Sequence, residues 1–290
     1  MKKRLRLILS LVAALILALD GGLYLLDHLS AGRTLTEDTA VHFIDVGQGD
    51  ATLLLSGRQA VLVDAGTPES ADALVGYLHG LGIERLYAAV ATHPHADHIG
   101  GMAQVLDAFP VEHFYMGPET ASTAVYAAML DALERGGVHP TLPAPGDELV
   151  FDSGASLLFL GPDDDVSKRT LNDRSLITLF RAGEQRVLLM GDAEVPAEQS
   201  LLAHQPLLTC DILKVGHHGS DTSSSDELLR TIQPSTAVIS CGLDNDYGHP
   251  SAQTLRRLSE AGVDDVRTTA EAGTVVISLD PPSSDKENAA

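Results

Sequence analysis

Four potential metal ligands fall within six residues, directly after an apolar run, in this 290-residue chain. The segment reads His93-Pro94-His95-Ala96-Asp97-His98-Ile99-Gly100-Gly101. On an extended segment, residues two apart project to the same side, so His93 and His95 face one point, and Asp97 and His98 begin a helix that can turn toward it. The glycine pair permits close backbone approach. The pattern predicts a pocket for one or two divalent cations, as in a metal-dependent hydrolase; the alternative is a polar loop with solvated histidines.

Strand-like apolar runs alternate with helical patterns along the chain. Ala60 to Val63 is strand-like, Ser70 to Gly80 has a helical pattern, and Leu86 to Ala91 is again strand-like. This alternation predicts an α/β fold. The pattern alone leaves open whether the sheet is doubly wound or two sheets pack between helices.

Two later apolar runs also end in potential ligands. Arg186 to Met190 leads into Gly191-Asp192, and Cys210 to Val215 leads into Gly216-His217-His218. In open α/β folds such groups collect at the carboxyl ends of the strands, so both runs should end beside the first histidines. The alternative for Asp192 is an ordinary turn or cap. Lys214, inside its strand, should pair with a nearby carboxylate.

Polar residues mark further loops at this edge. Asp45, Gln48 and Asp50 lie in a glycine-containing turn, which is either a plain hairpin or a loop that approaches a ligand. Asp64 follows Val61-Leu62-Val63 at a strand end. His249 follows the predicted strand Thr236 to Cys241 and should face the same edge, unless its loop only leads into the next helix.

These motifs together resemble the metallo-β-lactamase fold superfamily and, within it, the ComEC/Rec2-like hydrolase domains of competence proteins. The motifs are the His-x-His-x-Asp-His pattern, Phe43-Ile44-Asp45-Val46-Gly47-Gln48-Gly49-Asp50-Ala51, Met190-Gly191-Asp192 and Leu213-Lys214-Val215-Gly216-His217-His218-Gly219-Ser220. The resemblance extends from about Val41 to Leu279. It implies an α/β fold of the αββα sandwich type that binds one or two divalent ions, Zn or Mn.

The resemblance also implies which residues hold the metal. The implied ligands are His93, His95, Asp97, His98, Asp192 and His217. Asp192 bridges two ions, and of the last histidine pair we favour His217 as the ligand, with His218 lining the pocket. Asp64 is expected to orient a ligand histidine or the loop.

One ligand of the superfamily pattern is missing from this sequence. A third histidine for the first ion would lie between the first motif and Asp192, but that interval contains only His113, in a strand-like run where a structural role fits better, and His139, in a loop. The competence-type pattern has Asn172 and Ser175 at this place. Asn is a weak ligand for zinc and a reasonable one for harder cations such as Mn²⁺.

The implied reaction is hydrolysis by a metal-bound hydroxide. Asp97 would steer this nucleophile, and Ser175, His218 and His249 are candidate contacts for substrate oxygens. A phosphodiesterase or nuclease is the preferred function. The alternatives are a hydrolase of small lactones, β-lactams or esters, and a non-catalytic metal-binding surface module.

The formal charge of −21 bears on the partners. An acidic surface repels phosphate backbones, and the sequence lacks a Lys/Arg stripe of the kind that nonspecific nucleic-acid binding requires. DNA is therefore disfavoured as a partner relative to a small phosphodiester. Bound cations would nevertheless make the pocket itself positive.

The first 35 residues predict a membrane signal. Lys2, Lys3, Arg4 and Arg6 precede a 13-residue apolar run from Leu7 to Leu19. We expect one N-terminal hydrophobic helix, either an uncleaved anchor that holds the hydrolase on the outer face of a bacterial-type membrane, or a signal that is cleaved from a secreted protein. The alternative is a buried amphipathic helix in a cytosolic protein. Residues 36–280 should form one hydrolase domain, followed by a disordered tail at residues 281–290.

The chain has two cysteines, Cys210 and Cys241. If their strands are parallel neighbours, the thiols lie on the order of 15 Å apart at about 3.3 Å per residue. A disulfide requires Cα atoms within about 7 Å. We therefore predict two buried free thiols.

Overall fold

The computed structural model describes residues 39–162 and 169–280. The predicted N-terminal hydrophobic helix and the predicted C-terminal tail lie outside the described residues. Within the described part, no helix combines the length and the apolar character needed to cross a membrane.

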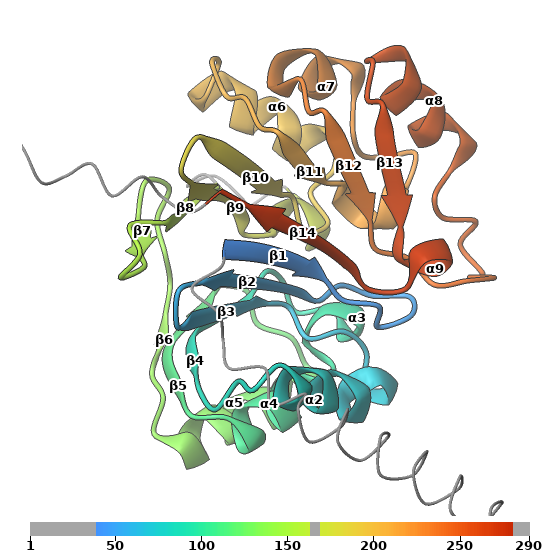
Figure 1. The fold of residues 1–290 in the computed structure, drawn as a ribbon. Helices are drawn as coiled ribbons and strands as arrows, with labels where there is room; N and C mark the ends of the chain where they lie inside the picture. Colours follow the sequence, from blue (N-terminus) through green and yellow to red (C-terminus); the bar gives the residue numbers. More distant parts are fainter. Residues whose placement is uncertain (1–38, 163–168, 281–290) are drawn as a thin grey trace, which may run out of the picture.

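Two seven-stranded sheets pack face to face (Figure 1). The first has the order β14 (Val275–Leu279), β1 (Thr39–Phe43), β2 (Thr52–Ser56), β3 (Gln59–Val63), β4 (Leu86–Ala91), β5 (Val111–Met116) and β6 (Pro140–Thr141). The second has the order β13 (Asp265–Thr268), β12 (Thr236–Ile239), β11 (Ile212–Lys214), β10 (Gln185–Leu189), β9 (Ile177–Ala182), β8 (Ser156–Gly161) and β7 (Glu148–Val150).

Helices cover the outer face of each sheet (Figure 1). On the first sheet lie α2 (Ala71–Gly80), α4 (Met102–Ala108) and α5 (Ala124–Gly136), with the short α3 (Ala96–Ile99) at the sheet edge. On the second lie α6 (Val195–His204), α7 (Asp226–Ile232) and α8 (Ala252–Glu260), while α9 (Thr269–Ala272) precedes β14. This arrangement confirms the predicted αββα sandwich.

Side chains along β4 point alternately into two apolar cores, one between the two sheets and one under the helices. In β4, Ala88 and Val90 belong to the core between the sheets, whereas Ala89 and Ala91 belong to the core under the helices. A strand buried on both faces reads as an uninterrupted apolar run, and Leu86–Ala91 has that sequence. The strand was therefore predicted with its observed bounds.

The thiols of Cys210 and Cys241 are free and buried, as predicted. Their flanking strands β11 and β12 are parallel neighbours, with Cys210 before the first and Cys241 after the second. Burial raises the pKa of the Cys210 thiol to about 12 and also raises that of Cys241.

We expect neither thiol to react with Ellman's reagent while the protein is folded, because the reactive species is the thiolate and both groups are shielded. In denaturant, both thiols should titrate rapidly. Fast reaction of either thiol in the folded protein would show that its segment is more open than the structure indicates.

Candidate metal centre

The predicted ligands converge at one edge of the sandwich. His93 and His95 follow the end of β4, and Asp97 and His98 lie on α3. Asp192 follows β10 from the other sheet. His217 and His218 follow β11 in a tight turn, Gly216–Gly219. The cluster forms because strands from both sheets end here, which is the edge that the sequence predicted.

Asp192 lies at the centre of the cluster and is 2% exposed. Its Oδ1 is 3.1 Å from His98 Nε2 and 3.6 Å from His218 Nε2. Its Oδ2 is 3.6 Å from His93 Nε2 and 3.9 Å from His217 Nε2. The two oxygens of this carboxylate therefore face two different sets of imidazoles.

Around Asp192 the side chains form two groups, each with its ligand atoms within 4.8 Å of one another, and a third such group of Asp50, Asp64 and His98 lies behind them. The Asp97 group consists of Asp97, His98, Asp192 and His218, and the His95 group consists of His93, His95 and Asp192. Asp192 belongs to both groups. This is the arrangement of a bridging carboxylate between two cations, with nitrogen and oxygen donors that suit zinc or manganese.

Hydrogen bonds behind the imidazoles aim them at the centre. His98 Nδ1 donates to Asp64 Oδ2 at 2.7 Å, and His218 Nδ1 donates to the Ser240 carbonyl oxygen at 3.0 Å. His93 Nδ1 lies 3.3 Å from Ser175 Oγ. These contacts leave the three Nε2 atoms directed inward, as metal-ligating histidines require. Asp64 thus has the orienting position that the sequence suggested.

The chemistry of the donors fits a cation. His98 Nε2 and Asp192 Oδ1 are buried without a hydrogen-bond partner, although they are 3.1 Å apart. Burial alone would raise the pKa of Asp192, but the charges of His98 and His218 hold it well below its usual value. Burial and the charge of His98 hold the pKa of His93 well below its usual value. Two buried donor atoms that face each other without a hydrogen-bond partner are what a bound cation would satisfy.

Asp97 is the most exposed carboxylate of the cluster, with 35% of its side chain accessible. Its Oδ2 lies 3.2 Å from His218 Nε2. Burial would raise the pKa of Asp97, but the contact with His218 and the charges of His98 and His218 lower it overall. Asp97 is therefore an ionised acceptor at the mouth of the cluster.

The adjacent histidines divide differently from the sequence-based preference. The structure groups His218, rather than His217, with Asp97, His98 and Asp192. Both residues have positive φ, 48° for His217 and 54° for His218. A non-glycine residue seldom adopts this conformation, and the spacing of the sequence gives no sign of it. His217 lies beside Asp192 Oδ2 instead.

Three more of the predicted residues, Ser175, Asn172 and His249, lie around the cluster. Ser175 Oγ accepts from the Asp192 amide at 3.1 Å, and the Asn172 amide lies 3.3 Å from His217 Nε2, so both border the cluster. The His249 ring lies edge-on to His217, with ring centroids 5.7 Å apart, and is stacked with His218 at 6.4 Å.

Asp45 and Gln48 lie farther out. Asp45 is exposed and accepts from the Gly47 amide, whereas Gln48 accepts from the Gly242 amide at 3.0 Å and so ties its loop to the segment after β12. Among the described residues, His113 and His139 join no metal-ligating group. His113 packs edge-on against Tyr87, which agrees with a structural role.

A buried ion pair lies beneath the cluster. Lys214 Nζ is 2.5 Å from Asp50 Oδ2, and both side chains are almost fully inaccessible. Asp50 also lies close to Asp64 and His98. Lys214 therefore pairs with a carboxylate, as expected, and compensates negative charge behind the candidate ligands.

Replacing Lys214 with methionine should lower the free energy of unfolding by about 3–5 kcal/mol, because Asp50 would remain buried without its cation. Arg135→Met is the matched control. It breaks the exposed Arg135–Asp107 pair and should cost about 1 kcal/mol or less. Urea unfolding of both variants measures the difference. Equally small losses of unfolding free energy in the two variants would contradict the role of Lys214 as the partner of a buried charge.

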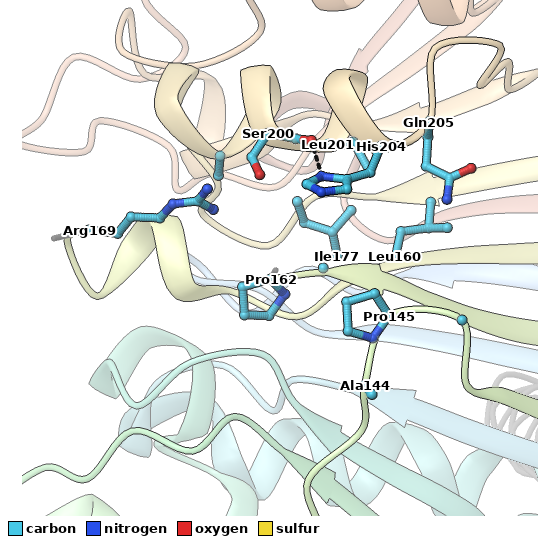
Figure 2. A pocket seen from close by; sticks show the side chains of 13 residues that line it. Ala144, Pro145, Leu160, Pro162, Arg169, Ile177, Ser200, Leu201, His204 and Gln205 are labelled. Atoms are coloured by element: carbon cyan, nitrogen blue, oxygen red, sulfur yellow. Dashed lines mark hydrogen bonds between the residues drawn. The ribbon is translucent and has the colours of Figure 1, made fainter. Parts of the chain in front are cut away.

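A cavity of about 660 Å³ lies away from these residues, against α6 (Figure 2). Leu160, Ile177 and Leu201 form apolar parts of its wall, and the His204 ring lies against the Ser200 carbonyl oxygen at 2.9 Å. Its lining, taken over the described residues, contains one histidine and no carboxylate. The histidine cluster therefore remains the better candidate for chemistry.

The sequence of this chain is similar to those of known proteins. A model of the metallo-beta-lactamase superfamily matches residues 44–243. ComE operon protein 3 of Bacillus subtilis is 31% identical over 253 residues, and the match covers 81% of this chain and 32% of that protein. Recombination protein 2 of Haemophilus influenzae is 32% identical over 225 residues, covering 75% of this chain and 26% of that protein. The chain thus spans about a third or less of the length of these relatives.

Solved structures share the fold. The metallo-beta-lactamase fold protein YhfI of Bacillus subtilis superposes with a TM-score of 0.55 at 13% identity, covering 83% of this chain and 100% of that chain. CmlA, a diiron beta-hydroxylase from Streptomyces venezuelae, superposes with a TM-score of 0.58 at 15% identity, covering 85% of this chain and 55% of that chain. At these identities the likeness concerns the fold alone.

Proposed function

The chain belongs to the metallo-beta-lactamase superfamily, and we propose that it is a metal-dependent phosphodiesterase or nuclease. The observation that carries this proposal is the shared carboxylate of Asp192, which faces both ligand groups. Two cations held by one carboxylate are typical of enzymes that displace groups at phosphorus. The similarity to competence proteins supports a phosphodiester substrate.

The Asp97 group would hold one ion and the His95 group the other. Bound there, divalent ions would lower the pKa of a coordinated water toward about 7 and withdraw charge from a phosphoryl oxygen. Asp97 supplies an ionised hydrogen-bond acceptor that orients the attacking water. Asp192 fixes the spacing of the two groups, and Ser175 fixes Asp192 through its backbone amide.

We expect His249 to contact a substrate oxygen. Its Nδ1 is buried without a hydrogen-bond partner, and its ring lies next to His217 and His218. Burial, followed by the charges of His218 and His217, lowers its pKa, which favours the neutral imidazole. A neutral ring donates one hydrogen bond to the developing negative charge on the substrate.

Replacing His249 with alanine should lower kcat by roughly 10²-fold, the usual effect of removing one such donor, and should leave the metal content unchanged. His249→Asn retains an N–H donor and should recover part of the loss. Steady-state kinetics and metal analysis of the two variants check this. A loss of metal, or equal defects in both variants, would contradict the proposed contact.

The acidic composition favours a small phosphodiester over DNA. The formal charge of −21 opposes the approach of a polyanion. The bound cations would offset this locally, because they are the largest charges in the pocket. Salt dependence separates the cases, since binding to DNA weakens steeply with added salt whereas hydrolysis of a small diester changes little.

We also propose that residues 1–35 attach the hydrolase to the outer face of a bacterial-type membrane. The basic flank and the apolar run that follows support this placement. Fractionation of cells that express the full chain, with protease added to intact cells, tests it. Digestion of the hydrolase domain from outside is expected, and protection would contradict it.

The substrate class is tested by removing the metal, restoring Zn²⁺ or Mn²⁺, and assaying bis-p-nitrophenyl phosphate and single-stranded DNA alongside a lactone and a β-lactam. Metal-dependent cleavage of a phosphodiester is expected. Turnover of only the lactone or the lactam would overturn the phosphodiesterase proposal and keep the hydrolase. No turnover by a protein that retains its metal would favour a binding module.

A further inference from the structure

We propose that His217 and His218, although adjacent in sequence, ligate different cations. His218 completes the Asp97 group, and His217 supplies the third imidazole to the His95 group. This inference rests on the metal centre of the proposed function. It extends that function by assigning a third imidazole to the first ion, for which the sequence has no convincing histidine between the first motif and Asp192.

The His95 group is short of a ligand. It contains His93, His95 and the shared Asp192, whereas the Asp97 group contains four members. His93 Nε2 and His95 Nδ1 lie 2.9 Å apart and both face the Asp192 side of the cluster. A site with two imidazoles and one shared carboxylate leaves room for another protein donor.

His217 lies beside that place, next to the shared carboxylate, although its Nε2 is not within 4.8 Å of every ligand atom of the His95 group. Its Nε2 is 3.9 Å from Asp192 Oδ2, the same oxygen that lies 3.6 Å from His93 Nε2. His218 Nε2 lies on the other side, 3.6 Å from Asp192 Oδ1. The neighbouring histidines thus address the two oxygens of one carboxylate, which is what ligands of two bridged ions must do.

The hydrogen bonds of His217 are those of a metal-ligating histidine. Its Nδ1 lies 3.1 Å from Glu194 Oε1, and that carboxylate also accepts from Thr222 Oγ1 at 2.7 Å. With Nδ1 protonated and held by Glu194, the Nε2 lone pair faces Asp192. A carboxylate behind a histidine is the usual support of a metal-bound ring. Sequence analysis did not single out Glu194.

The backbone holds the two rings apart. His217 and His218 both adopt positive φ, and the His217 amide donates to the Gly191 carbonyl oxygen at 3.1 Å, next to Asp192. Left-handed conformations at two consecutive non-glycine residues are costly, and such strain is concentrated at functional sites. Here it separates the ring centroids by 6.1 Å and aims one ring at each group.

Asn172 provides a second, independent observation at the same place. Its Nδ2 is 3.3 Å from His217 Nε2, and its Oδ1 is buried without a hydrogen-bond partner. Rotation of the amide about its terminal bond would direct the unpartnered oxygen toward the position that His217 faces. An amide oxygen is a suitable additional donor for a hard cation such as Mn²⁺.

Metal stoichiometry of the full-length chain tests the assignment. After removal of metal, loading with Zn²⁺ and dialysis, mass spectrometry should find two ions per wild-type chain and one in His217→Ala. On a His95→Ala background, adding His217→Ala should remove no further ion, whereas adding His218→Ala should remove the second. His204→Ala, on the exposed end of α6, is the matched control and should retain two ions.

A second variant gives a positive signal that a misfolded protein would not give. His217→Cys loaded with Co²⁺ should gain a sulfur-to-cobalt charge-transfer band that the wild type lacks, since a thiolate at this position would bind the ion directly. Glu194→Gln should weaken the binding of the ion in the His95 group by about 10- to 100-fold.

The outcomes separate this inference from the proposed function. Two ions bound by His217→Ala with wild-type affinity, and no new band in His217→Cys, would overturn the role of His217 while the metal centre stands. A wild-type chain that binds no divalent ion would overturn the metal centre and this inference with it.

Discussion

Replacing Asp192 with alanine should abolish binding of both cations and lower hydrolysis by at least about 10³-fold. Its two oxygens face His98 and His218 on one side and His93 on the other, and within residues 39–162 and 169–280 no other single side chain belongs to both ligand groups. Loss of the metals removes both the activated water and the charge stabilisation, which together are worth several kcal/mol of the barrier.

The control for this variant is Asp131→Ala, which removes an exposed carboxylate from α5. It should retain two ions and full activity. Metal analysis and steady-state kinetics of the two variants are compared under the same conditions. Retention of a tightly bound pair of ions by Asp192→Ala would mean that the carboxylate is not the bridge.

Removing the metal from the wild-type chain should lower its Tm by roughly 5–15 °C. A ligand at 100 to 1,000 times its Kd stabilises the native state by about 2.7–4.1 kcal/mol, and each kcal/mol shifts the Tm of a domain of this size by about 2–4 °C. Without the ions, His98 Nε2 and Asp192 Oδ1 remain buried and unpartnered.

Calorimetry with a chelator, followed by addition of Zn²⁺ or Mn²⁺, measures this stabilisation. The metal-dependent gain should shrink as the pH falls, because protonated imidazoles do not bind metals. Asp192→Ala should show no response to the chelator. An unchanged wild-type Tm would indicate that the cluster holds no ion in the native state.

The candidate metal centre was largely predictable from sequence because its residues follow apolar strands. The pair His93 and His95, and likewise Asp192, come directly after strand-like apolar runs, and the carboxyl ends of such strands meet at one edge. The αββα layering was not predictable from periodicity, since a strand buried on both faces looks alike in a doubly wound sheet and in a sandwich. It came from the resemblance of the motifs.

The details that sequence could not supply depend on the backbone and on pairings between sheets. His218 belongs to the Asp97 group while His217 lies beside Asp192 Oδ2, and this placement depends on positive φ at both residues, which spacing does not encode. Glu194 reaches His217 from the start of α6, and Asp50 reaches Lys214 across the two sheets. Such contacts join residues that are distant in sequence and carry no local pattern.

Anomalous diffraction from crystals of the zinc-loaded protein tests the central claim most directly. The account predicts two peaks about 3.5–4 Å apart, the usual spacing of two-metal sites, on either side of the Asp192 carboxylate. One should lie within the His95 group and the other within the Asp97 group. A single structural ion elsewhere in the chain, or no ion beside Asp192, would contradict the assignment of this cluster as the catalytic metal centre.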